Sequence, residues 1–394
     1  MKINLIIFIS EFNFGGAGNS LFRLCKNLPK NLYNINIISL NNCAYEKELK
    51  KQNIKIFKIK NKKTSTAMFQ VSKITQKLIS NKYSKNIFIS NIYYSNILSI
   101  LFLRRLKIKI ILIERTPYQE LKIFFSLYDK IKKKIMRFLI GLTYKYADLC
   151  ISNSKYISKE YNKRHNLKFK TIYPPSFLNK ESLAKNIKKK KSDFIMGTVC
   201  RLSKEKGLFE FINVISKLKF NFKFLIIGNG PEKKKLEELV IKLNMKNKII
   251  FKGFMNYQKV KKELKKIDLF INCSYFEGFP NSVVESLAHG VPVLASQSHG
   301  GINEIIKNKN FGQIYKSEKD LINKISDIYY KKKKFYINKN EIDIHLAKFS
   351  ISENIKGYSN TFKNIWFNIF NAHLFKIKYT DNLLNQNFNN KQND

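Results

Sequence analysis

Short apolar runs recur along the chain, and most are followed by a segment with the spacing of an amphipathic helix. In the first half these runs are rich in Ile and Phe and have polar borders; they occupy 3–9, 35–40, 54–59, 86–90, 108–114, 148–154 and 170–176. Strands of a parallel sheet are buried on both faces and show this continuous apolar character. The pattern therefore predicts βαβ units around a parallel sheet.

The pattern breaks at Pro174-Pro175 and at the charged run 185–193, and a second series then begins. Its predicted strands are 194–200, 222–228, 248–253, 268–273 and 291–296, with helices between them such as 232–243 and 257–266. We therefore expect an α/β protein with two Rossmann-like domains whose parallel sheets face each other across a cleft. The expected parts are an N-terminal Rossmann-like domain at 1–180, a linker at 181–193 and a C-terminal Rossmann-like domain at 194–350. Ligands of such sheets bind beyond the carboxyl ends of the strands.

The chain after residue 350 divides into two parts. Residues 351–372 have apolar positions at helical spacing and predict a helix that packs back on the N-terminal domain. The polar tail 373–394 is expected to be disordered. No segment reaches the roughly 18 apolar residues of a spanning helix, and the apolar start at 1–10 is interpreted as a first strand rather than a signal peptide.

Composition indicates the compartment and the kind of partner. The five cysteines show no CxxC or Cys/His metal spacing, which favours free thiols in a reducing cytoplasm. The net charge is +46, carried mostly by Lys, and it is explained either by a solvated surface or by attraction to anions. Because no Arg-rich or aromatic-interleaved module occurs, no nucleic-acid partner is expected.

The segment 121–146 places Phe, Leu and Ile beside a dense Lys/Arg series. That profile suits peripheral contact with an anionic membrane, and it also suits an ordinary Lys-rich helix packed on its domain. In the first case the protein would lie on the inner face of the cytoplasmic membrane.

Two loops offer groups for an anion. Gly15 and Gly16 follow the first strand, where the backbone could approach a ligand, although the turn lacks the third glycine of a dinucleotide fingerprint. Arg201 and Lys206 bracket the loop after 194–200 and would suit a diphosphate. A plain βα turn and two solvated cations remain the alternatives.

The stretch "EGFPNSVVES" at 277–286 carries two glutamates. Ser282 and Glu285 match a capping box, with Asn281 or Ser282 as the cap of a helix that ends near Gly290. Glu277 lies outside that box. The helix start could bind a diphosphate, so a carboxylate beside it is expected to bind sugar hydroxyls.

Glu277 and Glu285 are separated by seven residues, and with "GFPNS" between them they resemble the E-x7-E motif of the family-four retaining glycosyltransferases. The segments "RLSKEKG", "IGNGPE", "FKGF" and "GGINEII" follow in the order and spacing of that family, so that the resemblance covers most of the chain. It implies the GT-B fold and a nucleotide-diphosphate sugar as donor, with no cofactor and no metal. It also implies that 1–180 is the acceptor-side domain and 194–350 the nucleotide-sugar-binding domain.

The resemblance also implies roles for individual residues. Glu277 would contact the transferred sugar and Glu285 the ribose, while Glu304 is carried over with a structural role as its alternative. The donor diphosphate and the rest of the sugar would meet Arg201, Lys206, Gly15, Gly16 and the backbone near Phe279, Asn281 and Ser282.

One position departs from the family pattern. Relatives often carry a His near the reacting centre, and the matching strand end here offers Arg115, which cannot act as a base. Arg115 could steady the leaving diphosphate, in keeping with a retaining reaction in which that phosphate takes the acceptor proton, or it could form an ion pair with Glu114. The expected activity is transfer of a hexose or N-acetylhexosamine to a lipid-linked or other glycan acceptor for polysaccharide or lipopolysaccharide synthesis. A sugar-nucleotide epimerase and a basic nucleic-acid-binding protein are the alternatives.

Overall fold

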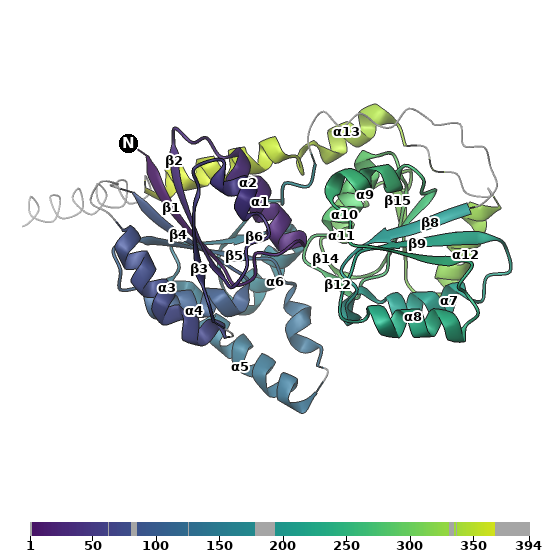
Figure 1. The fold of residues 1–394 in the computed structure, drawn as a ribbon, viewed down its shortest axis with the longest axis horizontal. Helices are drawn as coiled ribbons and strands as arrows, with labels where there is room; N and C mark the ends of the chain where they lie inside the picture. Colours follow the sequence, from purple (N-terminus) through teal and green to yellow (C-terminus); the bar gives the residue numbers. More distant parts are fainter. Residues whose placement is uncertain are drawn as a thin grey trace, which may run out of the picture.

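The computed structural model describes residues 2–61, 63–79, 85–124, 126–177, 194–330, 335 and 337–366. Two α/β units lie side by side, the first in purple and blue and the second in teal and green (Figure 1). The predicted class, two parallel-sheet α/β domains, is confirmed. The expected linker 181–193 and the tail 373–394 fall outside the described residues, and the exact domain boundaries stay predictions.

The first unit is built on a seven-stranded parallel sheet with the order β3-β2-β1-β4-β5-β6-β7. Its strands are β1 (Ile3–Ile9), β2 (Tyr33–Leu40), β3 (Lys55–Ile59), β4 (Asn86–Asn91), β5 (Lys109–Glu114), β6 (Leu149–Ser152) and β7 (Phe169–Thr171). Its helices are α1 (Gly16–Asn27), α2 (Glu46–Lys50), α3 (Thr64–Leu78), α4 (Tyr93–Leu103), α5 (Leu127–Thr143) and α6 (Lys155–His165), with 3-10 turns η1 (Tyr118–Lys122) and η2 (Tyr144–Tyr146).

The second unit has a six-stranded sheet with the order β10-β9-β8-β11-β13-β15 and a two-stranded ribbon of β12 and β14. Its strands are β8 (Phe194–Val199), β9 (Phe222–Ile227), β10 (Ile249–Gly253), β11 (Leu269–Asn272), β12 (Phe276–Glu277), β13 (Val293–Ser296), β14 (His299–Gly300) and β15 (Gly312–Tyr315). Its helices are η3 (Lys204–Lys206), α7 (Leu208–Ile215), α8 (Lys233–Lys242), α9 (Tyr257–Leu264), α10 (Asn281–Ala288), α11 (Ile302–Ile305), α12 (Glu318–Tyr329) and α13 (Lys339–Ala347).

Strand β1 shows why the apolar runs are continuous. All seven of its residues are buried. Leu5 and Ile7 join the core on the α1 side, while Ile6 and Phe8 join the core that contains Met68 of α3. Successive side chains point to opposite faces of a sheet, so a strand covered by helices on both faces needs apolar residues at every position.

The last described segment, 351–366, packs on the first unit. Residues 351–366 are helical, and in Figure 1 this yellow-green segment runs above the purple strands. Tyr358 and Phe362 are buried in the same core as β1, and the ring of Phe362 lies 5.7 Å from that of Tyr33. Burial of two aromatic rings ties this segment to the N-terminal sheet.

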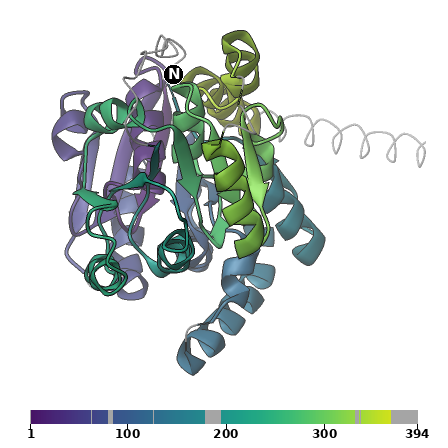
Figure 2. The same ribbon diagram turned by 90° about the vertical axis from the view of Figure 1, so that its right-hand side faces the viewer.

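Helix α5 extends away from the body of the first unit in both views (Figure 1, Figure 2). Its Ser126 N-cap accepts a hydrogen bond from the Asp129 N–H. No helix among the described residues combines the length and the apolar character needed to cross a bilayer.

Candidate active site

A cavity of about 320 Å³ lies between the two units. One wall comes from residues that follow β4, β5 and β6, and the other from η3, β12 and the start of α10. The carboxyl ends of the strands thus meet across the cavity, as expected for open parallel sheets. Its volume is in the range of small-molecule sites.

Glu277 and Lys206 form an ion pair in this cavity. The Lys206 Nζ lies 2.6 Å from Glu277 Oε1, and both side chains are at least four-fifths buried. The Ser274 hydroxyl donates to the same oxygen at 3.0 Å. Since both contacts use Oε1, the second carboxylate oxygen can accept a hydrogen bond from a ligand hydroxyl.

The ion pair keeps Lys206 charged. Burial lowers the pKa of Lys206, but the Glu277 carboxylate and its hydrogen bond outweigh burial, so the pKa is raised overall. A diphosphate that enters the cavity would therefore meet a cation that is already fixed in place.

The ribbon of β12 and β14 places Glu277. Phe276 pairs with His299 and Glu277 with Gly300 in parallel register. Gly300 has φ +140, and a Cβ there would come within 1.4 Å of the Glu277 carbonyl oxygen. Only glycine fits this position, because the backbone conformation and the close approach both exclude a side chain.

Arg115 lines the opposite wall of the cavity. Its Nε donates to Asn91 Oδ1 at 3.3 Å. No ion pair joins Arg115 to Glu114, both of which the structure describes; the Glu114 carboxylate instead accepts the Arg115 and Thr116 backbone N–H groups and the Tyr144 hydroxyl. Burial raises the pKa of Glu114 to about 7, and these three donors partly offset that rise.

The two walls touch at Gly278. A Cβ on Gly278 would lie 1.7 Å from the Arg115 carbonyl oxygen and 3.1 Å from the Asn153 amide nitrogen. The backbone next to Glu277 therefore reaches the backbone of the other unit directly.

Substitution of Gly278 by Ala is expected to hold the units apart, because the new methyl group would meet a backbone atom that cannot rotate away. Each unit should stay folded, while kcat/KM for the reaction proposed below falls about 100-fold, the usual cost of a misplaced site. Gly357→Ala is the matched control, since the nearest atoms to its Cβ would be side-chain carbons of Ile172, the first at 3.2 Å. Steady-state kinetics and circular dichroism of both variants check this, and full activity of Gly278→Ala would contradict it.

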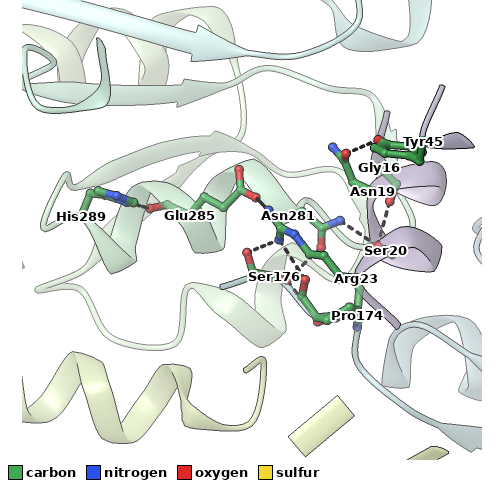
Figure 3. A network of polar contacts seen from close by, with 11 residues as sticks. Gly16, Asn19, Ser20, Arg23, Tyr45, Pro174, Ser176, Asn281, Glu285 and His289 are labelled. Atoms are coloured by element: carbon green, nitrogen blue, oxygen red, sulfur yellow. Dashed lines mark hydrogen bonds and ion pairs between the residues drawn. The ribbon is translucent and has the colours of Figure 1, made fainter. Parts of the chain in front are cut away.

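Arg23 of α1 connects the first unit to Glu285 of α10 (Figure 3). Its Nη2 lies 2.9 Å from Glu285 Oε1, and the two side chains are 15% and 13% exposed. Its Nη1 donates to the carbonyls of Pro175 and Ser176 at 2.9 and 2.5 Å. One guanidinium thus joins α1, α10 and the segment that leads out of the first unit.

This geometry corrects the capping-box prediction. Helix α10 begins at Asn281 with Pro280 in the N-cap position, and no side chain bonds to the cap. The helix starts earlier than a Ser282 cap would allow, so Glu285 lies in its second turn, and Pro280 at the cap has no N–H for a capping box to use. Gly290, with φ +74, follows the helix end as expected.

The structure brings together some of the remaining predicted residues. Gly16, Phe279 and Asn281 line the cavity, whereas Gly15, Ser282, Glu285 and Arg201 are not among its lining residues. The Asn281 side chain joins the units, since its Nδ2 donates to Ser20 Oγ at 3.3 Å and its Oδ1 accepts from Ser176 Oγ at 2.9 Å. Arg201 is exposed at the end of β8.

Glu304 has a structural position. Its carboxylate accepts the backbone N–H groups of Lys155 and Tyr156 at the start of α6, and also the Tyr173 hydroxyl at 2.7 Å. An acid from the second unit therefore caps a helix of the first.

The sequence interpretation missed Arg23 and Glu120. Arg is scarce in this chain, and the rarity that drew attention to Arg201 applies equally to Arg23. Glu120 lines the cavity from η1 and carries no motif in sequence.

Residues 179–340 match the family model described as "Glycosyl transferases group 1". Over these residues the chain is similar to that glycosyltransferase family. It is 32% identical over 179 residues to an uncharacterized glycosyltransferase of Methanocaldococcus jannaschii. The matched region covers 41% of this chain and 43% of the relative. It is also 30% identical over 184 residues to N-acetylgalactosamine-N,N'-diacetylbacillosaminyl-diphospho-undecaprenol 4-alpha-N-acetylgalactosaminyltransferase of Campylobacter jejuni, covering 45% of this chain and 49% of the relative.

The fold of this chain matches that of Anabaena HepE in complex with UDP-glucose, with a TM-score of 0.75, 18% identity and coverage of 92% and 100% of the two chains. The match confirms the GT-B fold. The chain spans less than half the length of the two curated relatives.

Proposed function

We propose that the protein is a retaining glycosyltransferase that moves a hexose or an N-acetylhexosamine from a nucleotide-diphosphate sugar to a lipid-linked glycan. The observation that carries the proposal is the interdomain cavity in which Glu277, Lys206 and Arg115 converge. Such a site offers cations for a diphosphate and a carboxylate for sugar hydroxyls, as the proposed substrates require.

In the proposed reaction, Lys206 and the N–H groups at the start of α10 bind the donor diphosphate. The second carboxylate oxygen of Glu277, Oε2, accepts a hydrogen bond from a hydroxyl of the sugar. The bond from the anomeric carbon to the diphosphate breaks, and the acceptor oxygen bonds to that carbon on the same face. The acceptor proton passes to the departing phosphate oxygen, and Arg115 stabilises the charge that develops there.

A uridine base is the first candidate for the donor, because the HepE structure holds UDP-glucose. A thermal-shift screen of the protein against uridine, guanosine and adenosine diphosphate sugars tests this, since a ligand that binds only the folded state raises the melting temperature. A rise with one class would support the proposal. No shift with any class at millimolar concentration would contradict it.

Helix α5 would bring the enzyme to a lipid-linked acceptor. Leu127, Ile131, Ile135, Phe138 and Leu142 recur at helical spacing on one exposed face. Exposed lysines of the same helix, Lys130, Lys132 and Lys134, lie beside them. An exposed apolar stripe with flanking cations fits the interface of an anionic bilayer, with the ring and alkyl groups in the acyl region.

We expect Ile131→Glu to weaken binding to phosphatidylglycerol vesicles roughly tenfold. It replaces an apolar contact with the lipid by a negative charge that the anionic headgroups repel. Ile344→Glu is the matched control, because Ile344 is 78% exposed in α13 of the second unit and Ile131 is 54% exposed. Sedimentation with vesicles at two salt concentrations measures both. Equal losses in the two variants would contradict a role for α5.

The proposed compartment is the cytoplasm, with the enzyme on the inner face of its membrane and its product a step in surface polysaccharide or lipopolysaccharide synthesis. All five cysteines are free thiols, which is in keeping with a reducing compartment. The Campylobacter relative is named for a diphospho-undecaprenol acceptor, and an acceptor of that class suits an anionic bilayer and the α5 surface.

A further inference from the structure

Glu120 differs from the other charged groups of the cavity in having no partner within the described part of the chain. Glu277 is paired with Lys206, and Arg115 donates to Asn91. Glu205 accepts from the Ser203 hydroxyl. The Glu120 carboxylate takes part in no hydrogen bond or ion pair within the residues that the structure describes, although it lines the same cavity and is partly buried.

An acid in this position is unfavourable for folding. Burial raises the pKa of Glu120 from its ordinary 4.5 to about 7. The charged and titratable groups that act on it from the elements around it are Lys133 and Asp129 of α5, Lys206 and Glu205 of η3, Glu114 of β5, Tyr93 of α4 and Tyr161 of α6. A desolvated acid without a partner is typical of functional sites.

We propose that Glu120 is the acceptor-recognition residue of this cavity and accepts a hydrogen bond from an acceptor hydroxyl other than the one that attacks the donor sugar. The inference rests on the proposed function and adds a contact that the sequence did not indicate. Glu120 lies on the first unit, across the cavity from Glu277, so that one carboxylate serves each substrate.

The surroundings of Glu120 lead from the cavity to helix α5. Turn η1, which carries Glu120, packs against α5. Lys133 of α5 donates to the Ile123 carbonyl, just after η1, at 2.7 Å. A lipid-linked acceptor held at the α5 surface would therefore reach Glu120 along one continuous piece of the first unit.

The substitution Glu120→Gln tests the proposal. The probes are the diphosphate sugar that gives the largest thermal shift and a polyprenyl-diphosphate N-acetylhexosamine in phosphatidylglycerol vesicles. We expect kcat/KM for the acceptor to fall about 10- to 100-fold, the effect of one hydrogen bond to a charged group. KM for the donor and the hydrolysis of donor by water should not change, and Glu318→Gln, at an exposed ion pair, is the control.

The pH profile separates recognition from a structural role. The raised pKa means that the carboxylate ionises only as pH rises through about 7, so acceptor kcat/KM should rise there in the wild type and not in Glu120→Gln. The folded state binds a proton that the unfolded state has lost between pH 4.5 and about 7, so stability from this group falls as pH rises across that window. At pH 8 the variant should therefore be at least as stable as the wild type.

Two results would overturn the inference. One is unchanged acceptor kinetics in Glu120→Gln, and the other is an equal loss of donor affinity, acceptor affinity and stability, which would indicate a structural role. A wild type that binds no diphosphate sugar would overturn the proposed function and this inference together. Normal turnover that the substitution does not affect would overturn the inference alone.

Discussion

Replacement of Glu277 by Gln is expected to lower kcat for glycosyl transfer by about 10²- to 10³-fold, the loss seen when one group that stabilises developing charge is removed. Glutamine keeps the shape of the side chain but cannot stabilise positive charge at the anomeric carbon, and it no longer pairs with the Lys206 ammonium 2.6 Å away. Nucleotide binding should persist, because the start of α10 remains in place.

Kinetics with a diphosphate sugar and titration with the nucleotide alone measure the two effects separately. Glu237→Gln is the control, since its ion pair with Lys233 is more than two-fifths exposed on each side and is worth little. Equal kcat for Glu277→Gln and wild type would remove Glu277 from the reaction. Loss of the fold by circular dichroism would show instead that the ion pair is structural.

Replacement of Arg23 by Ala is expected to destabilise the protein by on the order of 3 kcal/mol, because it leaves the mostly buried Glu285 carboxylate without this guanidinium. It also removes the donor to the carbonyls of Pro175 and Ser176. If Glu285 binds the ribose, as the family resemblance implies, KM for the donor should rise about tenfold, since the carboxylate loses its fixed orientation.

Denaturant unfolding and donor KM check this prediction in Arg23→Ala, Arg23→Lys and the double variant with Glu285→Ala. The lysine of Arg23→Lys keeps the charge but lacks the planar guanidinium. That variant should therefore lose less stability and less donor affinity than Arg23→Ala. The double variant should lose less than the sum of the single losses. Arg164→Ala is the control, because its pair with Glu160 is more exposed, with the two side chains 32% and 21% exposed. An equal effect of that substitution would contradict a special role for Arg23.

The apolar runs predict most strands of both units and their succession along the chain. Every predicted strand has a counterpart, and the strands that were missed are β12, β14 and β15. Strands β12 and β14 have two residues each, which is too short for any periodicity to show. Glu277 lies on one of them, so its neighbours depend on tertiary pairing.

The candidate site was predictable only where a motif marked it. The loop of Lys206 and the stretch from Glu277 to Asn281 meet in the cavity. The partner of Glu285 was not predictable, because Arg23 lies 262 positions away and the pair exists only across the interface between the units. Local capping chemistry was the nearer explanation for Glu285, and the start of α10 at Asn281 rules it out.

The most direct test of the account is the anomeric configuration of the first transfer product. The wild type is mixed with an α-linked diphosphate sugar and the lipid-linked acceptor. Proton NMR then shows the anomeric configuration of the product that forms first. The account predicts an α-linked product and the release of nucleoside diphosphate. A β-linked product, or a free epimerised sugar nucleotide formed without acceptor, would contradict it.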